Sequence, residues 1–153
     1  MRRRTDPLSR GQHRKIAGDL FNYTWSLLDQ TKRSAEECDE MLHAAHASRY
    51  HWGHAGTPLN LSVGEWQVSR VYSALGRAEP ALYHGRRALE IARRDRLGRF
   101  YLAYAYEAMA RAAAVAGQRR NRNRYLREAR RVGAQVRDRD DRRMLLEDLA
   151  TIP

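Results

Sequence analysis

The fold predicted for this chain depends on one stretch, SVGEWQVSRVYSALGRAEPALYHGRRALEIAR, which runs from Ser62 to Arg93. An apolar helical pattern continues up to a break at Gly76, and a second helical pattern follows the break. In the second pattern Ala81 and Ala88 stand seven residues apart on one face. Small side chains on a shared face allow two helices to approach each other closely. The stretch therefore predicts an antiparallel helical hairpin.

Related patterns recur on both sides of this hairpin. A shift forward by 41 residues places Gly76 on Gly117 and Ala88 on Ala129, and a shift back by 43 residues places Ala88 on Ala45. Recurrence at such a period is the sequence signature of a helical-repeat architecture. We therefore expect three units, over residues of about 11–52, 62–94 and 100–135.

In this pattern the chain resembles the tetratricopeptide repeat, a helix–turn–helix unit of about 34 residues. The residues at signature positions of that repeat are Tyr72, Gly76, Ala81 and Ala88. Trp66 lies one residue from the family's tryptophan, and Arg93 replaces its closing proline. The chain is also similar to uncharacterised bacterial proteins of this type that carry an HAAHAS-x-YHW run. The resemblance implies an all-α stack of three antiparallel helical hairpins, with a seventh helix as a cap.

Local signals predict where the helices begin and end. Ser34 with Glu37 forms the pattern of a capping box. The longest break is expected from Gly53 to Leu61, with Ser62 as the cap of the next helix. Asp138 or Asp140 is expected to cap the last helix. These signals divide the chain into an N-terminal arm, 1–10, and one helical domain, 11–153, whose capping segment is 138–150.

The chain carries a formal net charge of +11, and 27 of its 29 basic residues are arginine. Residues 76–143 hold 19 arginines and 8 acidic residues, so the whole excess lies there. Nucleic-acid binding through the arginine-rich C-terminal half is one interpretation. A solvated surface is favoured, because the arginines fall on most sides of their helices and aromatic residues for base stacking are not interleaved with those of 119–143.

Cysteine content and hydropathy predict a cytoplasmic protein. Cys38 is the single cysteine, so no internal disulfide can form, as is usual in a reducing compartment. The basic start of the chain has no apolar run behind it, which argues against a signal peptide. No stretch approaches the roughly 18 apolar residues that a membrane span needs. We therefore expect no membrane association.

The segment HAAHASRYHWGH, from His43 to His54, holds four of the six histidines. Because a helix advances about 100° per residue, His43 and His46 share a face with Tyr50, and His51 lies at its edge. His54 is expected in the following loop. Glu65 is predicted to face inward from the next helix, and a buried carboxylate needs a partner.

Three interpretations of this histidine face stay open. Its side chains can be structural or solvated, or they can form a metal-free polar pocket. They can also hold a transition metal (Zn, Fe or Cu), since imidazole and carboxylate are usual ligands of these ions. The residues proposed for such a metal site, in an enzyme or a sensor, are His43, His46, His51 and Glu65.

A concave groove is the second candidate site, because stacked repeats line such a surface with the first helix of each unit. In the family register the residues expected in the groove are Tyr23, Trp66, Arg70, Glu107 and Arg111. Guanidinium groups bind carboxylates with two hydrogen bonds, which suits an acidic ligand. Members of the family often bind chain-terminal carboxylates, but their usual lysine and asparagine are not matched here. The alternative is that the two arginines pair with Glu65 or Glu107 and stabilise the stack.

The function expected from these features is binding of a protein or peptide that carries an acidic or carboxylate group. No motif of an established enzyme class is present in the sequence: the nucleophile-elbow, P-loop and H-E-x-x-H patterns are all missing. No reaction can therefore be named from the sequence.

Overall fold

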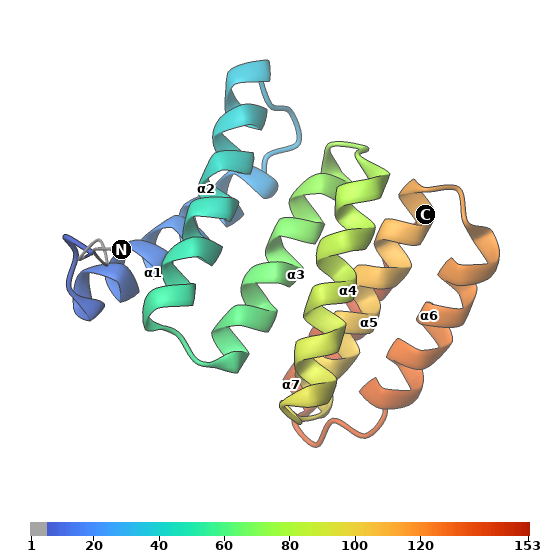
Figure 1. The fold of residues 1–153 in the computed structure, drawn as a ribbon. Coiled ribbons are helices and arrows are strands. Elements are labelled where there is room, and N and C mark those ends of the chain that lie inside the picture. Colours follow the sequence, from blue (N-terminus) through green and yellow to red (C-terminus); the bar gives the residue numbers. More distant parts are fainter. Residues whose placement is uncertain (1–5) are drawn as a thin grey trace.

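The computed structural model describes residues 6–153, which form seven α-helices and no β-strand. Consecutive helices pair as hairpins, and the hairpins lie side by side in chain order (Figure 1). The helices are α1 (Arg10–Leu28), α2 (Ala35–Ala55), α3 (Pro58–Ala74), α4 (Ala78–Arg94), α5 (Arg99–Val115), α6 (Arg119–Gly133) and α7 (Arg139–Ala150). The predicted all-α stack of three hairpins followed by a C-terminal helix is confirmed.

The turns of the second and third hairpins have the same geometry. Gly76 and Gly117 adopt φ values of +70° and +69°, a left-handed conformation that favours glycine. One residue later, the amide of Arg77 donates to the carbonyl of Tyr72 and that of Gln118 donates to the carbonyl of Ala113, each at 2.9 Å. In each turn a backbone amide thus caps a carbonyl near the end of the preceding helix, where the chain reverses direction.

Buried hydroxyl groups tie the two helices of the central hairpin together. From α3, the Ser62 hydroxyl donates to the carbonyl of Ala88 at 3.0 Å, and the Ser69 hydroxyl donates to the carbonyl of Ala81 at 2.8 Å. Both alanines of α4 are fully buried, as expected for small residues on a helix–helix face. Their size lets the α4 backbone come within hydrogen-bond distance of the α3 side chains.

The long break predicted from Gly53 to Leu61 is wrong. Helix α2 continues to Ala55 and α3 begins at Pro58, so His54 is helical and Ser62 lies inside α3. Proline fits the first turn of a helix because the amide it lacks has no partner there. The preceding amide, that of Thr57, donates to the side chain of Asn60 at 3.0 Å.

The other predicted helix starts are confirmed by their caps. Ser34 and Glu37 form the capping box of α2, with hydrogen bonds of 3.1 and 2.8 Å. The Asp138 carboxylate accepts from the amides of Asp140 and Asp141 at 2.9 Å each, and α7 begins at Arg139. These caps bond amides at the helix start that have no partner within the helix.

The C-terminal helix closes the exposed side of the third hairpin. Leu145 and Leu149 of α7 are buried in a core cluster that includes Ala129, Val132 and residues of α4 and α5. This contact also brings the face of α7 that carries Met144 and Asp148 toward α3 and α5. Helix α7 therefore has two roles, since it covers apolar surface and forms one wall of the pocket described below.

The expected N-terminal arm, 1–10, falls partly outside the described residues, which begin at Asp6. In the part that is described, Asp6 contacts His13 of α1 and His54 of α2. No helix within residues 6–153 combines the length and apolar character needed to cross a membrane.

Candidate functional site

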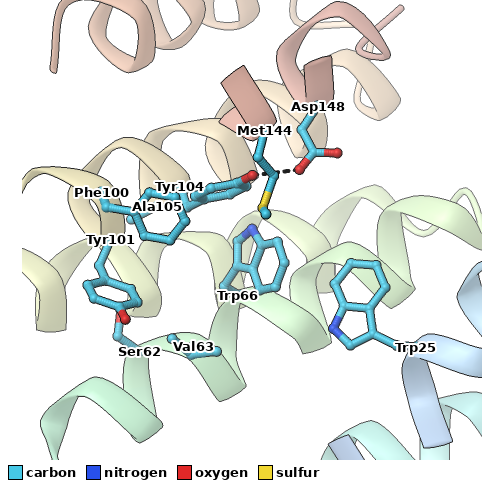
Figure 2. Close-up of a pocket in the computed structure, with 10 residues that line it drawn as sticks. All are labelled: Trp25, Ser62, Val63, Trp66, Phe100, Tyr101, Tyr104, Ala105, Met144 and Asp148. Atoms are coloured by element: carbon cyan, nitrogen blue, oxygen red, sulfur yellow. Dashed lines mark hydrogen bonds between the residues drawn. The ribbon is translucent and has the colours of Figure 1, made fainter. Parts of the chain in front are cut away.

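An aromatic pocket of about 350 Å³ lies where α1, α3, α5 and α7 meet (Figure 2). The side chains of Trp25 and Trp66 stand next to each other, with ring centroids 5.5 Å apart. The rings of Tyr104 and Trp66 are nearly perpendicular, and their centroids lie 5.4 Å apart. The lining residues are Trp25, Ser62, Val63, Trp66, Phe100, Tyr101, Tyr104, Ala105, Met144 and Asp148. A pocket of this size and composition is in the range of protein ligand sites.

One polar pair stands at the α7 wall of this pocket. The Tyr104 hydroxyl donates to Asp148 Oδ2 at 2.7 Å, as Figure 2 shows. Burial and this hydrogen bond raise the pKa of Tyr104 far above its usual range, so the phenol stays protonated. Asp148 thus presents a carboxylate to an otherwise apolar cavity, where it can accept a hydrogen bond from a ligand.

Beneath the pocket, Glu107 of α5 is fully buried and accepts hydrogen bonds from three side chains. Trp66 Nε1 donates to Glu107 Oε2 at 2.8 Å, and Arg70 Nη1 and Arg111 Nε donate to Oε1 at 3.0 and 2.7 Å. A buried carboxylate is stable when its charge is paired and its oxygens are bonded. The cluster fixes the orientation of the Trp66 ring at the pocket floor.

A second depression, also about 350 Å³, adjoins the first and shares Trp25 with it. Arg70 and Arg111 line it, together with Ser73. The buried Ser73 hydroxyl has no hydrogen-bond partner within residues 6–153. The two guanidinium groups are balanced by Glu107, which both of them contact, and by the carboxylate of Asp29, which lines the same depression.

The structure brings four of the five predicted groove residues together, namely Trp66, Arg70, Glu107 and Arg111. Glu107 lies below the surface rather than in the groove, because both arginines and the indole cover it. Tyr23 lines neither depression and is 39% exposed; burial and a hydrogen bond with Glu40 of α2 raise its pKa.

Sequence reasoning missed several walls of the pocket. Phe100 and Tyr104 stand four residues apart and therefore share a helix face, a pattern that could have indicated an aromatic surface. Trp25 stands 43 residues before Val68, at the same position of its repeat. Its position in the pocket follows from how the first hairpin packs on the second, and the sequence holds no local sign of this.

The second buried acid, Glu65 of α3, is bound by residues from two other helices. Arg49 Nε of α2 donates to Oε1 at 2.9 Å, and His84 Nδ1 of α4 donates to Oε2 at 2.6 Å. Burial raises the pKa of Glu65, but the hydrogen bond from His84 and the charge of Arg49 outweigh burial, so the net pKa is lowered. A Cβ at Gly64 would meet the Arg49 side chain at 2.8 Å, so glycine makes room for this ion pair.

His46 lies beside this ion pair and bonds to a tyrosine. Its Nε2 is 2.9 Å from the Tyr72 hydroxyl, and its ring centroid is 5.3 Å from that of His84. Burial, reinforced by repulsion from His84, lowers the pKa of His46. The imidazole is therefore neutral near pH 7, and its Nε2 can accept a hydrogen bond from the Tyr72 hydroxyl.

The predicted grouping of His43, His46, His51 and Glu65 is corrected by the structure. His43 is exposed on α2, and the partners of Glu65 are Arg49 and His84. His51 belongs to a separate cluster with His13. The Nδ1 atoms of these two histidines are 2.7 Å apart. Residues five positions apart on a helix differ by about 140°, which separates His46 from His51.

Eight of the 19 arginines of residues 76–143 are exposed on α6 or at the start of α7. Some pair with neighbouring acids, such as Arg131 with Glu128 at 2.7 Å and Arg143 with Asp140 at 3.1 Å. This arrangement is that of a charged, solvated helix face.

Comparison with known proteins adds no relative. No family model matches the chain, and neither a curated protein nor a solved structure shows significant similarity to it. Interpretation of the site therefore depends on its geometry.

Proposed function

We propose that this protein is a tetratricopeptide-like binding module that takes a peptide segment into the aromatic pocket and the adjoining arginine-lined depression. The observation that carries the proposal is the cavity of about 350 Å³ whose walls include Trp25, Trp66 and Tyr104. Aromatic side chains supply large apolar contact area at low entropic cost, which makes them frequent anchors of binding sites.

The two depressions differ in chemistry, and the difference suggests which peptide fits. The aromatic pocket suits one bulky apolar side chain of a peptide. Asp148 at the pocket wall can accept a hydrogen bond from a backbone N–H of the same peptide. The depression with Arg70 and Arg111 suits a carboxylate, either of an acidic side chain or of a chain terminus. We therefore propose a segment in which an apolar anchor stands close to a carboxylate.

The rigidity of the site also supports a binding role. Trp66 and the two arginines are held by Glu107 in one hydrogen-bonded cluster, so a ligand meets side chains that are already ordered. Preorganised sites lose less conformational entropy on association. The proposed location is the cytoplasm, where a lone cysteine such as Cys38 stays reduced.

Selection from a library of displayed random peptides with free C-termini tests this proposal. We expect the enriched sequences to place an aromatic or leucine residue within a few positions of an acidic residue or of the terminus. Isothermal titration with the enriched peptides then measures affinity for the wild type and for Trp25→Ala. Loss of the indole is expected to weaken binding by about 2 kcal/mol, as for an interface anchor.

The matched control is Tyr83→Ala, which removes an aromatic residue that is 51% exposed on α4, outside both depressions. Its affinity should equal that of the wild type. The proposal fails if no selected peptide binds the wild type, or if Trp25→Ala binds the selected peptides as tightly as Tyr83→Ala does.

A further inference from the structure

A cluster of titratable side chains outside the pocket lies at the N-terminal end of α1 and the C-terminal end of α2. It consists of Asp6, His13, His51 and His54, with the Tyr50 ring beside it. His13 is 3% exposed. A histidine this deeply buried needs a hydrogen-bond partner for each ring nitrogen, and Asp6 and His51 supply them. The peptide-binding proposal uses none of these residues.

The atoms of this cluster converge as metal ligands do. Asp6 Oδ2 lies 2.9 Å from His13 Nε2 and 3.1 Å from His54 Nδ1. All three ligand atoms lie within 4.8 Å of one another, and no other set of three such side chains in residues 6–153 meets this limit. Two ligands of a tetrahedral zinc ion are about 3.3 Å apart, given metal–ligand bonds of about 2.0 Å. The observed spacing is close to that value.

His51 is not one of these three ligands, but it contacts one of them. Its Nδ1 is 2.7 Å from Nδ1 of His13, the ring nitrogen that faces away from Asp6. If His13 donates its proton through Nδ1, its Nε2 carries the lone pair that a metal needs. A ligating histidine usually makes such a second hydrogen bond, which fixes its tautomer and its ring orientation.

We propose that Asp6, His13 and His54 form a binding site for a divalent transition metal of the zinc class, with His51 as the positioning residue of His13. Two imidazoles and one carboxylate are a usual ligand set for such ions, and they leave a fourth coordination position for water. The site ties the segment before α1 to the last turn of α2.

Metal binding requires one side chain to tilt. The rings of His13 and His54 are stacked at 4.3 Å with an angle of 7° between them, whereas an ion lies near the plane of each imidazole that ligates it. His54 is 37% exposed in the last turn of α2, so its ring can reorient, while the buried His13 keeps its place. The site is thus half preformed.

Isothermal titration of the tag-free, full-length protein with ZnCl₂, after treatment with a chelator, tests the proposal. We expect one equivalent of Zn²⁺ to bind with a dissociation constant below about 10 µM, and the melting temperature to rise with added Zn²⁺. Two surface variants, His54→Ala and Asp6→Asn, should each weaken binding by about tenfold or more while they keep the helical circular dichroism of the wild type.

The matched control is His43→Ala, which removes an exposed histidine of the same helix and should bind Zn²⁺ as the wild type does. His46→Ala tests the other histidine cluster, and it should also leave the affinity unchanged. The proposal is overturned if the wild type binds no Zn²⁺, if His54→Ala binds as tightly as His43→Ala, or if His46→Ala is the variant that loses the metal.

Discussion

The two buried glutamates of this protein are neutralised in different ways. Glu107 of α5 is 0% exposed and is held by two arginines and an indole, whereas Glu65 of α3 is 6% exposed and is held by one arginine and one histidine. Glu107 accepts hydrogen bonds from three residues and Glu65 from two. They differ in the chemistry of their charged partners, which are two guanidinium groups for Glu107 and one guanidinium and one imidazole for Glu65.

This difference sets a cluster of arginines apart from one that has a titrating histidine beside it. Arginine stays charged at any pH at which the protein is folded, so the Glu107 cluster keeps the pocket floor in one state. Beside the Glu65 ion pair lies His46, and burial lowers the pKa of this imidazole. Only the Glu107 cluster lies against the aromatic pocket, so the proposed binding site should be insensitive to mild acid.

Replacing Glu107 is expected to have the largest effect on stability. Glu107→Gln keeps the shape and can still accept from Trp66, but it leaves Arg70 and Arg111 without a counter-charge. Because these guanidinium groups are largely buried, we expect a loss of about 3 kcal/mol in the free energy of unfolding. Urea denaturation followed by circular dichroism measures it.

The control for this variant is Glu90→Gln, which removes an exposed acid 3.9 Å from Arg87. It should change the free energy of unfolding by less than about 0.5 kcal/mol. Equal stability of the Glu107 and Glu90 variants would show that the buried cluster does not depend on its negative charge.

Replacing Glu65 should cost less. Glu65→Gln leaves Arg49 unpaired, but Arg49 is 21% exposed and can turn toward water. We expect a loss of about 2 kcal/mol in the same denaturation experiment. A loss that equals or exceeds that of Glu107→Gln would contradict the comparison between the two clusters.

The hydrogen bond between Tyr72 and His46 is expected to contribute less again. Tyr72→Phe removes only the hydroxyl, and both residues are partly exposed, so a loss of about 1 kcal/mol is expected. A double-mutant cycle with His46→Ala isolates the coupling between the two side chains. If the two losses add without coupling, the hydrogen bond does not contribute to stability.

The smallest expected effect is that of pH on the wild type. The pKa of His46 is lowered in the folded protein, chiefly by burial, so the unfolded state binds the proton more readily. The free energy of unfolding should therefore fall as the pH drops below about 6.5, the usual pKa of histidine, and continue to fall until the folded pKa is passed. The lowered pKa of Glu65 extends the loss to pH values below about 4.5.

Denaturation at pH 7.5 and at pH 5.5 measures this dependence. His46→Gln should reduce it, because glutamine does not titrate, while His43→Gln, at an exposed position, should leave it unchanged. A wild type whose stability is the same at both pH values would contradict the assignment of a neutral, half-buried His46.

Much of the fold was predictable from local patterns. The turn glycines 76 and 117 occupy left-handed positions, and the cap at Ser34 binds Glu37, because these features depend on residues a few positions apart. The boundary between α2 and α3 was not predicted. Gly53 suggested a helix end, yet α2 continues through it, since packing of the helix outweighs the modest cost of one glycine.

The candidate sites were predictable only in part. Trp66, Arg70, Glu107 and Arg111 were expected to lie near one another because the repeat register aligns them, and they do. His43 and His46 were placed on one face with His51 at its edge, but in the structure His43 is exposed and His46 lies beside His84. His51 and His54 lie in a separate cluster with His13 and Asp6. A helical wheel places residues on one helix and carries no information on what faces them.

The amino-acid sequence by itself determined the number and order of the helices and the turns within the second and third hairpins, since these follow from hydrophobic period, small residues and caps. Tertiary structure alone decided which side chains meet: Glu65 with Arg49 and His84, Glu107 with Trp66, and Trp25 with Trp66. The physical reason is that helix formation depends on contacts within one turn, whereas pockets and buried ion pairs form between helices whose separation and rotation are set by packing of the whole stack.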